Sequence, residues 1–388
     1  MTVQSPRPAH PAPPPLRGPA FGSYAADEVG WLLTDLSGVA LEAPTEEREE
    51  AVQSGGAHYA ESLPQEYQPD AGYLELYEEA LAASAPRLAQ AVGTVADMVL
   101  RERGRDVVLV SLARAGTPVG VLLRRWAARR YGLDLPHYAV SIVRGRGIDQ
   151  LALQYLDEHH DPAKVVFVDG WTGKGAISRE LAAAVELHAA STGARFDPEL
   201  AVLADPGRCA RLFGTRDDWL IASACLNSTV SGLVSRTVLN DRLIGPGQYH
   251  GAKFYAELAG ADVSNTFLDT VTAAFDDVRD TTPPTDRQPD FAGWAAVDRI
   301  VEEYGIGDPN LVKPGVGETT RVLLRRVPWR VLVRAGARAA DLAHVRLLAE
   351  RRGVPVEEVA DLPYSCVGLI HPRFTRGATG ADGLAAAR

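Results

Sequence analysis

Short apolar runs alternate with longer amphipathic stretches through the middle of the chain. The length and composition of four runs predict buried strands over residues 107–111, 138–143, 165–168 and 200–204. Apolar side chains at helical spacing predict helices over residues 73–103, 119–130, 150–158 and 176–190. Strands that alternate with helices in this order indicate an α/β domain, with a mainly parallel sheet and helices on both faces.

The pattern changes on either side of this α/β region. Residues 1–20 are proline-rich and predict a disordered tail, residues 27–36 predict a short helix, and residues 281–290 predict a linker. Beyond the linker, the pattern predicts helices over 294–304 and 342–352 and strands over 320–324, 330–333 and 367–370. The expected units are a large α/β domain over 21–280, a small α/β domain over 291–376 and a flexible tail over 377–388.

Length and composition narrow the class of protein. The 388 residues are enough for two domains, and the formal net charge of −10 argues against a general nucleic-acid binder. Three cysteines without a CxxC pair favour a reduced, cytoplasmic protein. The chain has no apolar run of about 18 residues and no apolar segment near its start, so neither a membrane span nor a signal peptide is expected.

One stretch combines a predicted strand, an acidic residue, a glycine-rich turn and a helix. Asp169 follows the run 165–168, and the turn leads into a helix whose N-terminal N–H groups can bind an anion. A Walker A loop needs four residues between its first glycine and its Gly-Lys pair, and the spacing here is too short. The predicted phosphate-binding residues are Gly170, Thr172, Gly173, Lys174, Gly175 and Ala176.

This stretch resembles the PRPP loop of type I phosphoribosyltransferases, where an apolar strand and one or two acids precede a short Thr/Gly loop. It departs from the motif in having Gly170 where a second acid is common. The resemblance implies a type I phosphoribosyltransferase-like sheet and a substrate of 5-phosphoribosyl 1-pyrophosphate (PRPP) with Mg²⁺. It also implies that Asp169 contacts the ribose hydroxyls and the metal. The alternative is an ordinary βα turn whose glycines serve only the backbone.

A second turn follows the strand predicted over 107–111. Ligands bind outside the carboxyl ends of strands in a doubly wound sheet, so neighbouring strands bring this turn beside Asp169. It resembles the pyrophosphate loop of the same enzymes, and the implied contacts are Ser111, Ala113, Arg114, Ala115 and Gly116. A flexible loop of that family implies that Arg144 and Arg146 close over the phosphates. A surface arginine on a βα turn and a solvated basic turn are the alternatives.

The hydroxyl-rich segment 224–238 widens the resemblance. Together with residues 22–24, 54–59 and 169–176, it resembles the bacterial StiP-type family over residues 21–275. That family is a divergent phosphoribosyltransferase domain found with tellurite-resistance and stress genes, and it is sometimes labelled a cysteine protease.

The protease alternative needs a thiolate within hydrogen-bond reach of a histidine. Cys225 has His58, His250 and Asn227 as candidate partners. A catalytic-cysteine signature on a helix is absent from the sequence, which favours Cys225 as a small buried side chain instead.

The C-terminal segment has different chemistry. Residues 317–321 resemble the Gly-x-Asn-Glu-x-x-Lys turn of Pelota-like RNA-binding domains, over residues 295–375. The resemblance implies RNA contacts at Lys313, Gly317, Glu318, Thr319, Arg321 and Arg325. Further arginines at 326, 330, 334 and 338 concentrate positive charge in an acidic chain, as phosphate-binding surfaces do. A solvated basic face is the alternative.

These resemblances together imply a cytoplasmic enzyme that transfers the phosphoribosyl group of PRPP, coupled to a domain for structured RNA. The expected nucleophile is a base-like nitrogen, and the acceptor's identity and homodimer formation stay open. The alternatives are a protease that uses Cys225 and a non-catalytic sensor that binds a nucleotide and RNA.

Overall fold

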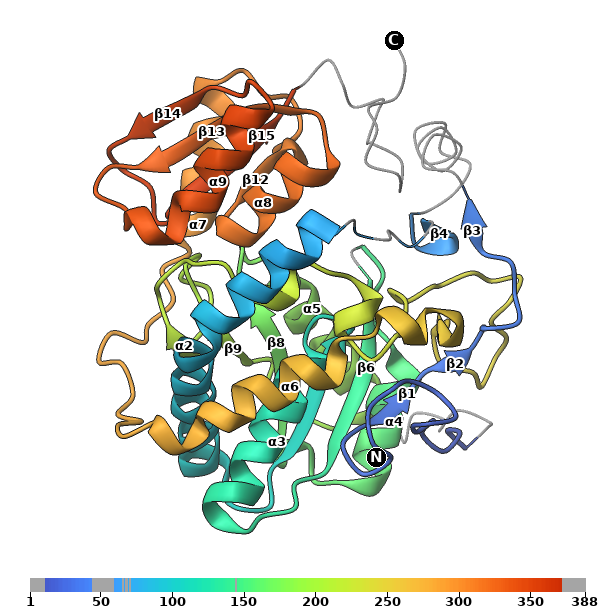
Figure 1. Cartoon of the computed structure of the whole chain (residues 1–388). Coiled ribbons are helices and arrows are strands. Elements are labelled where there is room, and N and C mark those ends of the chain that lie inside the picture. Colours follow the sequence, from blue (N-terminus) through green and yellow to red (C-terminus); the bar gives the residue numbers. More distant parts are fainter. Residues whose placement is uncertain are drawn as a thin grey trace.

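A mostly parallel sheet forms the centre of the larger domain in the computed structural model (Figure 1). The structure describes residues 11–43, 59–64, 66, 69, 71–143 and 145–371. Six strands run parallel in the order β1-β6-β5-β8-β9-β10, and β7 pairs with β6 in the antiparallel direction. Their bounds are β1 Gly30–Leu32, β5 Val108–Ala113, β6 His137–Val143, β7 Gly147–Ile148, β8 Val165–Trp171, β9 Leu200–Ala204 and β10 Leu212–Thr215.

Helices cover both faces of this sheet, as the buried strand pattern predicts. Alternate strand residues belong to different cores: Leu109 and Val166 pack with α2, α3 and α6, whereas Val110 and Phe167 pack with α4 and α5. In Figure 1, α2, α3 and α6 lie in front of the strands. The bounds are α2 Ala71–Arg103, α3 Thr117–Tyr131, α4 Gln150–His159, α5 Ala176–Thr192 and α6 Ser264–Ala273.

The prediction of a mixed α/β domain with a mainly parallel sheet is confirmed, and one local prediction within it is wrong. Residues 27–36 form β1 and β2 (Thr34–Asp35) instead of a helix. Trp31 and Leu32 point to opposite sides of the sheet, and both are fully buried in different cores. Burial on both sides gives an unbroken apolar run, which also fits a helical spacing.

Part of the proline-rich tail packs against this domain. Leu16 forms an antiparallel bridge with Trp31, and the Tyr249 hydroxyl donates a hydrogen bond of 2.7 Å to the Pro13 carbonyl. The ordered part of the chain therefore begins before Phe21, whereas the composition predicted that it begins at Phe21. Short pairs complete the domain periphery: β2 with β11 (Gly251–Ala252), and β3 (Glu42–Ala43) with β4 (Leu63–Pro64).

The smaller domain is a four-stranded sheet between helices. Its order is β12-β15-β13-β14, with α8 and α9 on one face and α7 on the other. The bounds are α7 Ala292–Glu303, β12 Val312–Pro314, α8 Val316–Arg325, β13 Pro328–Arg334, α9 Ala339–Arg351, β14 Val356–Val359 and β15 Cys366–Ile370. The strand predicted over 320–324 is therefore wrong, because those residues belong to α8.

The physical reason for that correction is the spacing of the buried residues. Val316, Thr320 and Leu323 are buried at intervals of four and three residues, which places them on one helix face. The Thr320 hydroxyl donates to the Val316 carbonyl at 2.7 Å, a bond within the helix. Two threonines and two valines among its ten residues give α8 a composition that is also typical of a strand.

The two domains share one hydrophobic core. Val316 and Leu323 of α8 and Val345 of α9 belong to the same cluster as Leu88 and Leu220 of the larger domain. The predicted linker is also anchored: the Thr281 hydroxyl donates to Asp97 at 2.5 Å and Arg287 donates to Glu102 at 2.7 Å. The small domain is therefore fixed above the sheet of the large one (Figure 1).

Candidate functional site

The strand order creates a topological switch point between β5 and β8. After β5 the chain crosses to β6 on one side, and it later returns to β8 on the other side of β5. Connections that leave in opposite directions open a crevice outside the carboxyl ends of the two strands. The turn with Ala115 and the turn with Gly173 follow these two strands. Both predicted phosphate-binding turns therefore meet at the switch point.

Glycines allow the backbone segments around this crevice to come close together. A Cβ atom on Gly116 would lie 2.4 Å from the Val168 carbonyl oxygen, and one on Gly207 would lie 1.9 Å from that of Gly173. Gly175 has φ 78° and immediately precedes α5, whose first-turn N–H groups lack acceptors within the helix. A side chain at any of these positions would push the segments apart or strain the turn.

A cavity of about 280 Å³ occupies the crevice. Its first wall comes from the large domain and contains Ala115, Asp169 and residues 171–178. Its second wall comes from the small domain and contains Val312, Lys313, Pro314 and Glu318. The volume suits a small ligand, and the amides at the start of α5 favour an anionic group.

Asp169 is the acidic group of the first wall. Removal from bulk water raises its pKa to about 7, and the Gly170 N–H, which donates to Asp169 Oδ1 at 2.8 Å, opposes the rise. The carboxyl group is therefore near the midpoint of its titration at neutral pH. Hydroxyl donors or a cation would favour its ionised form.

Thr172 fastens the glycine-rich turn instead of presenting its hydroxyl to the cavity. It donates to Asp205 Oδ1, and its N–H donates to the Ala204 carbonyl at 3.0 Å. The buried Asp205 also accepts from the Cys209 N–H at 2.8 Å and from Arg216 at 2.5 Å. Because its hydroxyl is bonded to Asp205, Thr172 can contact a phosphate only through its backbone atoms.

The turn after β5 presents its backbone to the crevice. Arg114 lies 3.3 Å from the Val234 carbonyl and 3.8 Å from a Glu66 carboxylate oxygen, so its side chain points toward the segment around 228–234. The Gly116 N–H donates to the Leu112 carbonyl at 3.0 Å. Of the predicted pyrophosphate contacts, only Ala115 lies in the cavity wall.

The remaining predicted contacts of this turn lie in the sheet. The Ser111 hydroxyl is buried and lies 2.8 Å from Nε2 of His137, whose Nδ1 lies 2.7 Å from the Glu28 carbonyl. Burial lowers the pKa of His137 to about 4. Ala113 pairs with Ser141 in the ladder between β5 and β6. These positions support the turn, and the sequence pattern could not separate support from contact.

The predicted basic loop is a tight turn between β6 and β7. The Arg146 N–H donates to the Val143 carbonyl at 3.0 Å, and the Gly145 N–H donates to Glu180 at 2.9 Å. Arg146 is exposed, and Arg144 lies outside the described residues. The turn lies at the carboxyl edge of the sheet, near the switch point but on the far side of β5.

The small domain holds the glycine-rich turn from above. Lys174 Nζ donates to the Pro309 carbonyl at 2.8 Å, and the Tyr364 hydroxyl donates to the Gly173 carbonyl at 3.0 Å. The Gly293 N–H donates to the Gly207 carbonyl at 3.1 Å. Lys174 therefore contacts the other domain, which the sequence motif alone did not predict.

Asp218 joins the two domains. Its carboxylate accepts from the Val316 N–H at 2.9 Å and from the Ser365 N–H at 2.8 Å, and its carbonyl accepts from the Ser365 hydroxyl at 2.8 Å. Burial raises the pKa of Asp218 to about 6, and these N–H donors oppose the rise. The bond to Val316 places the negative charge at the N-terminus of α8, where the helix dipole favours it.

The predicted RNA turn is part of the domain interface. A Cβ atom on Gly317 would lie 3.0 Å from that of Ala224, Arg321 donates to Asn227 at 3.3 Å, and Thr319 is buried. Residues 317–321, which resemble a turn in the sequence, form the docked first turns of α8 in the structure. Lys313 and Glu318 face the cavity, and Arg325 ends α8.

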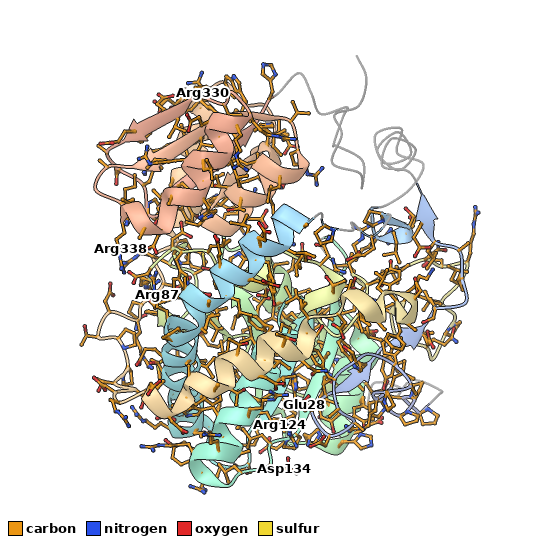
Figure 2. All side chains as sticks on the ribbon, viewed as in Figure 1. Glu28, Arg87, Arg124, Asp134, Arg330 and Arg338 are labelled. Carbon is orange, nitrogen blue, oxygen red and sulfur yellow. The ribbon has the colours of Figure 1, made fainter. Side chains whose placement is uncertain are left out.

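Two arginines that follow α8 in the small domain, Arg330 and Arg338, lie outside the first turns of that helix. Figure 2 shows Arg330 at the end of the small domain away from the large one, and Arg338 near Arg87 at the boundary. Arg330 stacks over Trp329 and Tyr304, with its guanidinium carbon 4.7 and 5.2 Å from the ring centroids. Arg330 therefore lies away from the domain contact, whereas Arg338 lies beside it.

The three thiols are buried, and the environment does not favour a thiolate at Cys209 or Cys366. Burial raises the pKa of Cys209 to about 12, and it raises that of Cys366 as well. Cys225 is buried. Of its predicted partners, His250 lies 2.8 Å from the Ser141 hydroxyl and Asn227 accepts from Arg321, while His58 lies outside the described residues.

Within the part of the chain that the structure describes, His, Cys, Asp and Glu side chains do not gather in threes in a way that could hold a metal ion. The helices described there all lack the combination of length and apolar character needed to cross a membrane.

The sequence analysis did not identify three residues that form or support the cavity. Trp171 lines the cavity, Asp205 anchors the glycine-rich turn, and Asp218 anchors α8. Asp205 follows a predicted strand just as Asp169 does, so its place at the carboxyl edge was a usable signal. Asp218 comes after β10, a strand that the sequence did not predict, and only its partners in the small domain show its role.

The comparisons with known proteins agree with both resemblances found in the sequence. A family model described as "Tellurite-like stress resistance cysteine protease StiP" matches residues 22–272, and one described as "PELOTA RNA binding domain" matches residues 291–372. The protein named cysteine protease StiP from Acinetobacter baylyi is 36% identical over 372 residues, covering 90% of this chain and 94% of the relative. The two StiP names match the protease alternative, and none of the three names mentions PRPP, magnesium or phosphoribosyl transfer.

Proposed function

Because the chain belongs to the StiP family of tellurite-like stress resistance, we propose an enzymatic role for the cavity at its switch point. The large domain binds Mg²⁺–PRPP there and transfers its phosphoribosyl group to a nitrogen nucleophile. One observation carries the proposal: Asp169, the glycine-rich turn and the N-terminus of α5 line a single cavity at the switch point between β5 and β8. A phosphate, a ribose and a metal-bound pyrophosphate need this combination of groups.

Each part of PRPP has a matching group in the cavity. The backbone N–H groups from Gly175 into α5 bind the 5′-phosphate, and Asp169 accepts from the ribose hydroxyls or holds Mg²⁺ that arrives with the pyrophosphate. The turn at Ala115 lies beside the pyrophosphate. The sequence predicted the Arg114 side chain as a pyrophosphate contact. Because Arg114 contacts Glu66 and Val234 outside the cavity wall, we assign this contact to the turn at Ala115 instead.

The reaction is a displacement at C1 of the ribose. A bond forms between the acceptor nitrogen and C1 while the bond from C1 to the pyrophosphate oxygen breaks, and the pyrophosphate leaves with that electron pair. The proton lost by the nitrogen passes to solvent or to Asp169. The protein contributes position and charge stabilisation, because no covalent enzyme intermediate is needed.

Calorimetry on the full chain tests the proposal. Mg²⁺–PRPP binds, and ribose 5-phosphate, which lacks the pyrophosphate, binds at least tenfold more weakly. Asp169→Asn should weaken PRPP binding. Its matched control is Asp161→Asn, which should bind PRPP like the wild type, since Asp161 caps a short turn just before β8 and lies outside the cavity wall. Absence of PRPP binding by the folded wild-type chain refutes this function.

A second candidate is a thiol peptidase, and the names of the family model and of the relative favour it. Peptide hydrolysis by a thiol requires that the sulfur ionise and reach a substrate. A fluorogenic casein assay before and after iodoacetamide treatment decides this candidate. Peptidase activity lost on alkylation, and lost again in Cys225→Ala with its fold intact, establishes the peptidase.

The small domain is proposed to bind structured RNA, because its residues 291–372 match a Pelota RNA-binding model. The docked first turns of α8 leave the exposed arginines, such as Arg338, as the phosphate contacts of the intact chain. Electrophoretic shifts with a kink-turn RNA should weaken steeply between low and moderate salt, because bound arginines release counterions. No shift at low salt refutes RNA binding.

A further inference from the structure

A second cavity lies between the two domains, and we call it the α2–α9 groove. It has a volume of about 380 Å³ and is lined by α2 of the large domain, residues 219–220 and α9 of the small domain. The residues described in its wall are all different from those of the cavity at the switch point. The volume suits a small organic ligand, and such sites often form where two domains meet.

Small side chains from both helices line the groove. Ala80 and Ala83 come from α2, and Ala340 and Ala343 come from α9. Leu347 of α9 adds a large apolar side chain that is 47% exposed. Because alanine methyl groups occupy little space on either side, the groove can admit a flat apolar ring.

An arginine stacked on a tryptophan adds a flat polar surface to the groove. The Arg87 guanidinium carbon lies 4.3 Å from the centroid of the Trp219 ring, and Nη1 donates to Asp341 at 2.7 Å. The pair joins α2 to α9, and Figure 2 shows Arg87 at the boundary between the domains. A guanidinium that stacks on one aromatic ring has a second face on which another ring can stack.

Two further polar groups of the groove are open to a ligand that donates hydrogen bonds. The Thr320 hydroxyl donates to the Val316 carbonyl, so its contact of 3.0 Å with Nε2 of His344 assigns a proton to Nε2. Burial lowers the pKa of His344 to about 4 and Asp341 opposes the fall, so the ring is neutral and Nδ1 is an acceptor. Among the described residues, neither Nδ1 nor the buried hydroxyl of Ser84 has a hydrogen-bond partner. Buried polar groups normally have one, in the protein or in a ligand or water.

The groove carries more negative than positive charge. Arg87 is its basic residue, and Arg87 already pairs with Asp341 and lies 3.5 Å from Asp217. Glu79 also lines the groove, and no basic side chain of the described residues lies within ion-pair distance of it. Glu79 precedes Arg87 on α2 by about 12 Å along the helix axis. One carboxylate is therefore left to balance a cation at a distance from the guanidinium.

We propose that the α2–α9 groove binds an aromatic amine, a planar ring that carries a primary ammonium group. The ring lies between the alanines of the two helices and stacks on the second face of Arg87. The ammonium group lies near Glu79, and a ring N–H donates to Nδ1 of His344. A carboxylate in place of the ammonium group would be repelled by Glu79. The ligand contacts both domains, and its site does not depend on phosphoribosyl transfer because the two cavities have different walls.

The test compares tryptamine with indole-3-acetate, which has the same ring and a carboxylate in place of the ammonium group. In calorimetry on the full chain, tryptamine should bind the wild type, and indole-3-acetate should bind at least tenfold more weakly. Tryptamine should also raise the melting temperature, because it binds the folded state. Glu79→Gln should weaken tryptamine at least fivefold. Its control is Glu186→Gln, an exposed position on α5, which should leave the affinity unchanged.

Filling the groove gives an independent test. Ala83 is exposed, so Ala83→Leu should fold and should remove tryptamine binding, whereas Ala182→Leu on the exposed face of α5 should not. Ala343→Leu fills the groove from α9 and covers the case in which Ala83→Leu fails to fold. A folded wild type that does not bind tryptamine at about 1 mM overturns the site. Unchanged affinity in the filled variants, or equal affinity for the two compounds, overturns it as well. These results leave the proposed PRPP function standing, and a failure of PRPP binding leaves this site standing.

Discussion

Replacing Asp169 with asparagine should remove both affinity for Mg²⁺–PRPP and the pH dependence of that affinity. Burial raises the pKa of Asp169 to about 7 in the free protein. Its ionised fraction therefore rises from about one tenth at pH 6 to about nine tenths at pH 8. If only the carboxylate binds the ribose hydroxyls or Mg²⁺, wild-type affinity should rise by about tenfold over this range.

The asparagine variant separates this effect from titration of the ligand. Phosphate groups titrate near pH 6, but that contribution is the same for both proteins. At pH 8 the variant should bind about 10- to 150-fold more weakly, because a hydrogen bond to a charged group is worth about 1.5–3 kcal/mol. The assay is calorimetry at pH 6, 7 and 8, in two buffers with different ionisation enthalpies, which also counts released protons. Equal pH slopes for wild type and Asp169→Asn would refute the assignment.

Three further predictions concern the frame of the site. Gly175→Ala should lower the melting temperature by about 2–4 °C and weaken PRPP binding, because a left-handed alanine costs about 1–2 kcal/mol and its Cβ would lie 3.0 Å from Cys209 Sγ. Gly193→Ala is its control: φ is 83° at the other end of the same helix with open space around it, so only stability should fall. Asp218→Asn should change the pH dependence of unfolding in urea: the folded pKa of about 6 lies above the ordinary value, so the wild type is favoured below about pH 4 and loses roughly 3 kcal/mol relative to the variant as pH rises through 6. A constant difference between the two proteins would contradict this. Cys225→Ala should cost about 1 kcal/mol of packing in thermal denaturation and leave PRPP binding unchanged. Lost PRPP binding in a folded Cys225 variant would disprove that view of the thiol.

The sequence by itself determined the elements whose signals are local. Buried runs predicted β5, β6, β8 and β9, and helical spacing predicted α2 to α5 and α9, because periodic burial follows from the geometry of each element alone. The cap of α4 also involves neighbouring residues alone, because Asp149 accepts from the N–H of Leu151 at 2.9 Å. The glycine-rich turn after β8 was found because its glycines, its acid and the helix that follows are consecutive in sequence.

Only the tertiary structure decided which side chains enter the cavity. Arg114 lies on a predicted ligand-binding turn, yet Glu66 and Val234, 48 and 120 residues away, determine its direction. The composition of residues 320–324 predicts a strand, but these residues are helical because they pack against β15 and the large domain. The sequence predicted Glu318 as an RNA contact. Its place in the same cavity wall as Trp171 depends on the bonds that the Val316 and Ser365 N–H groups donate to Asp218. Such contacts join residues 48 or more positions apart, and no local pattern records the partner that each side chain selects.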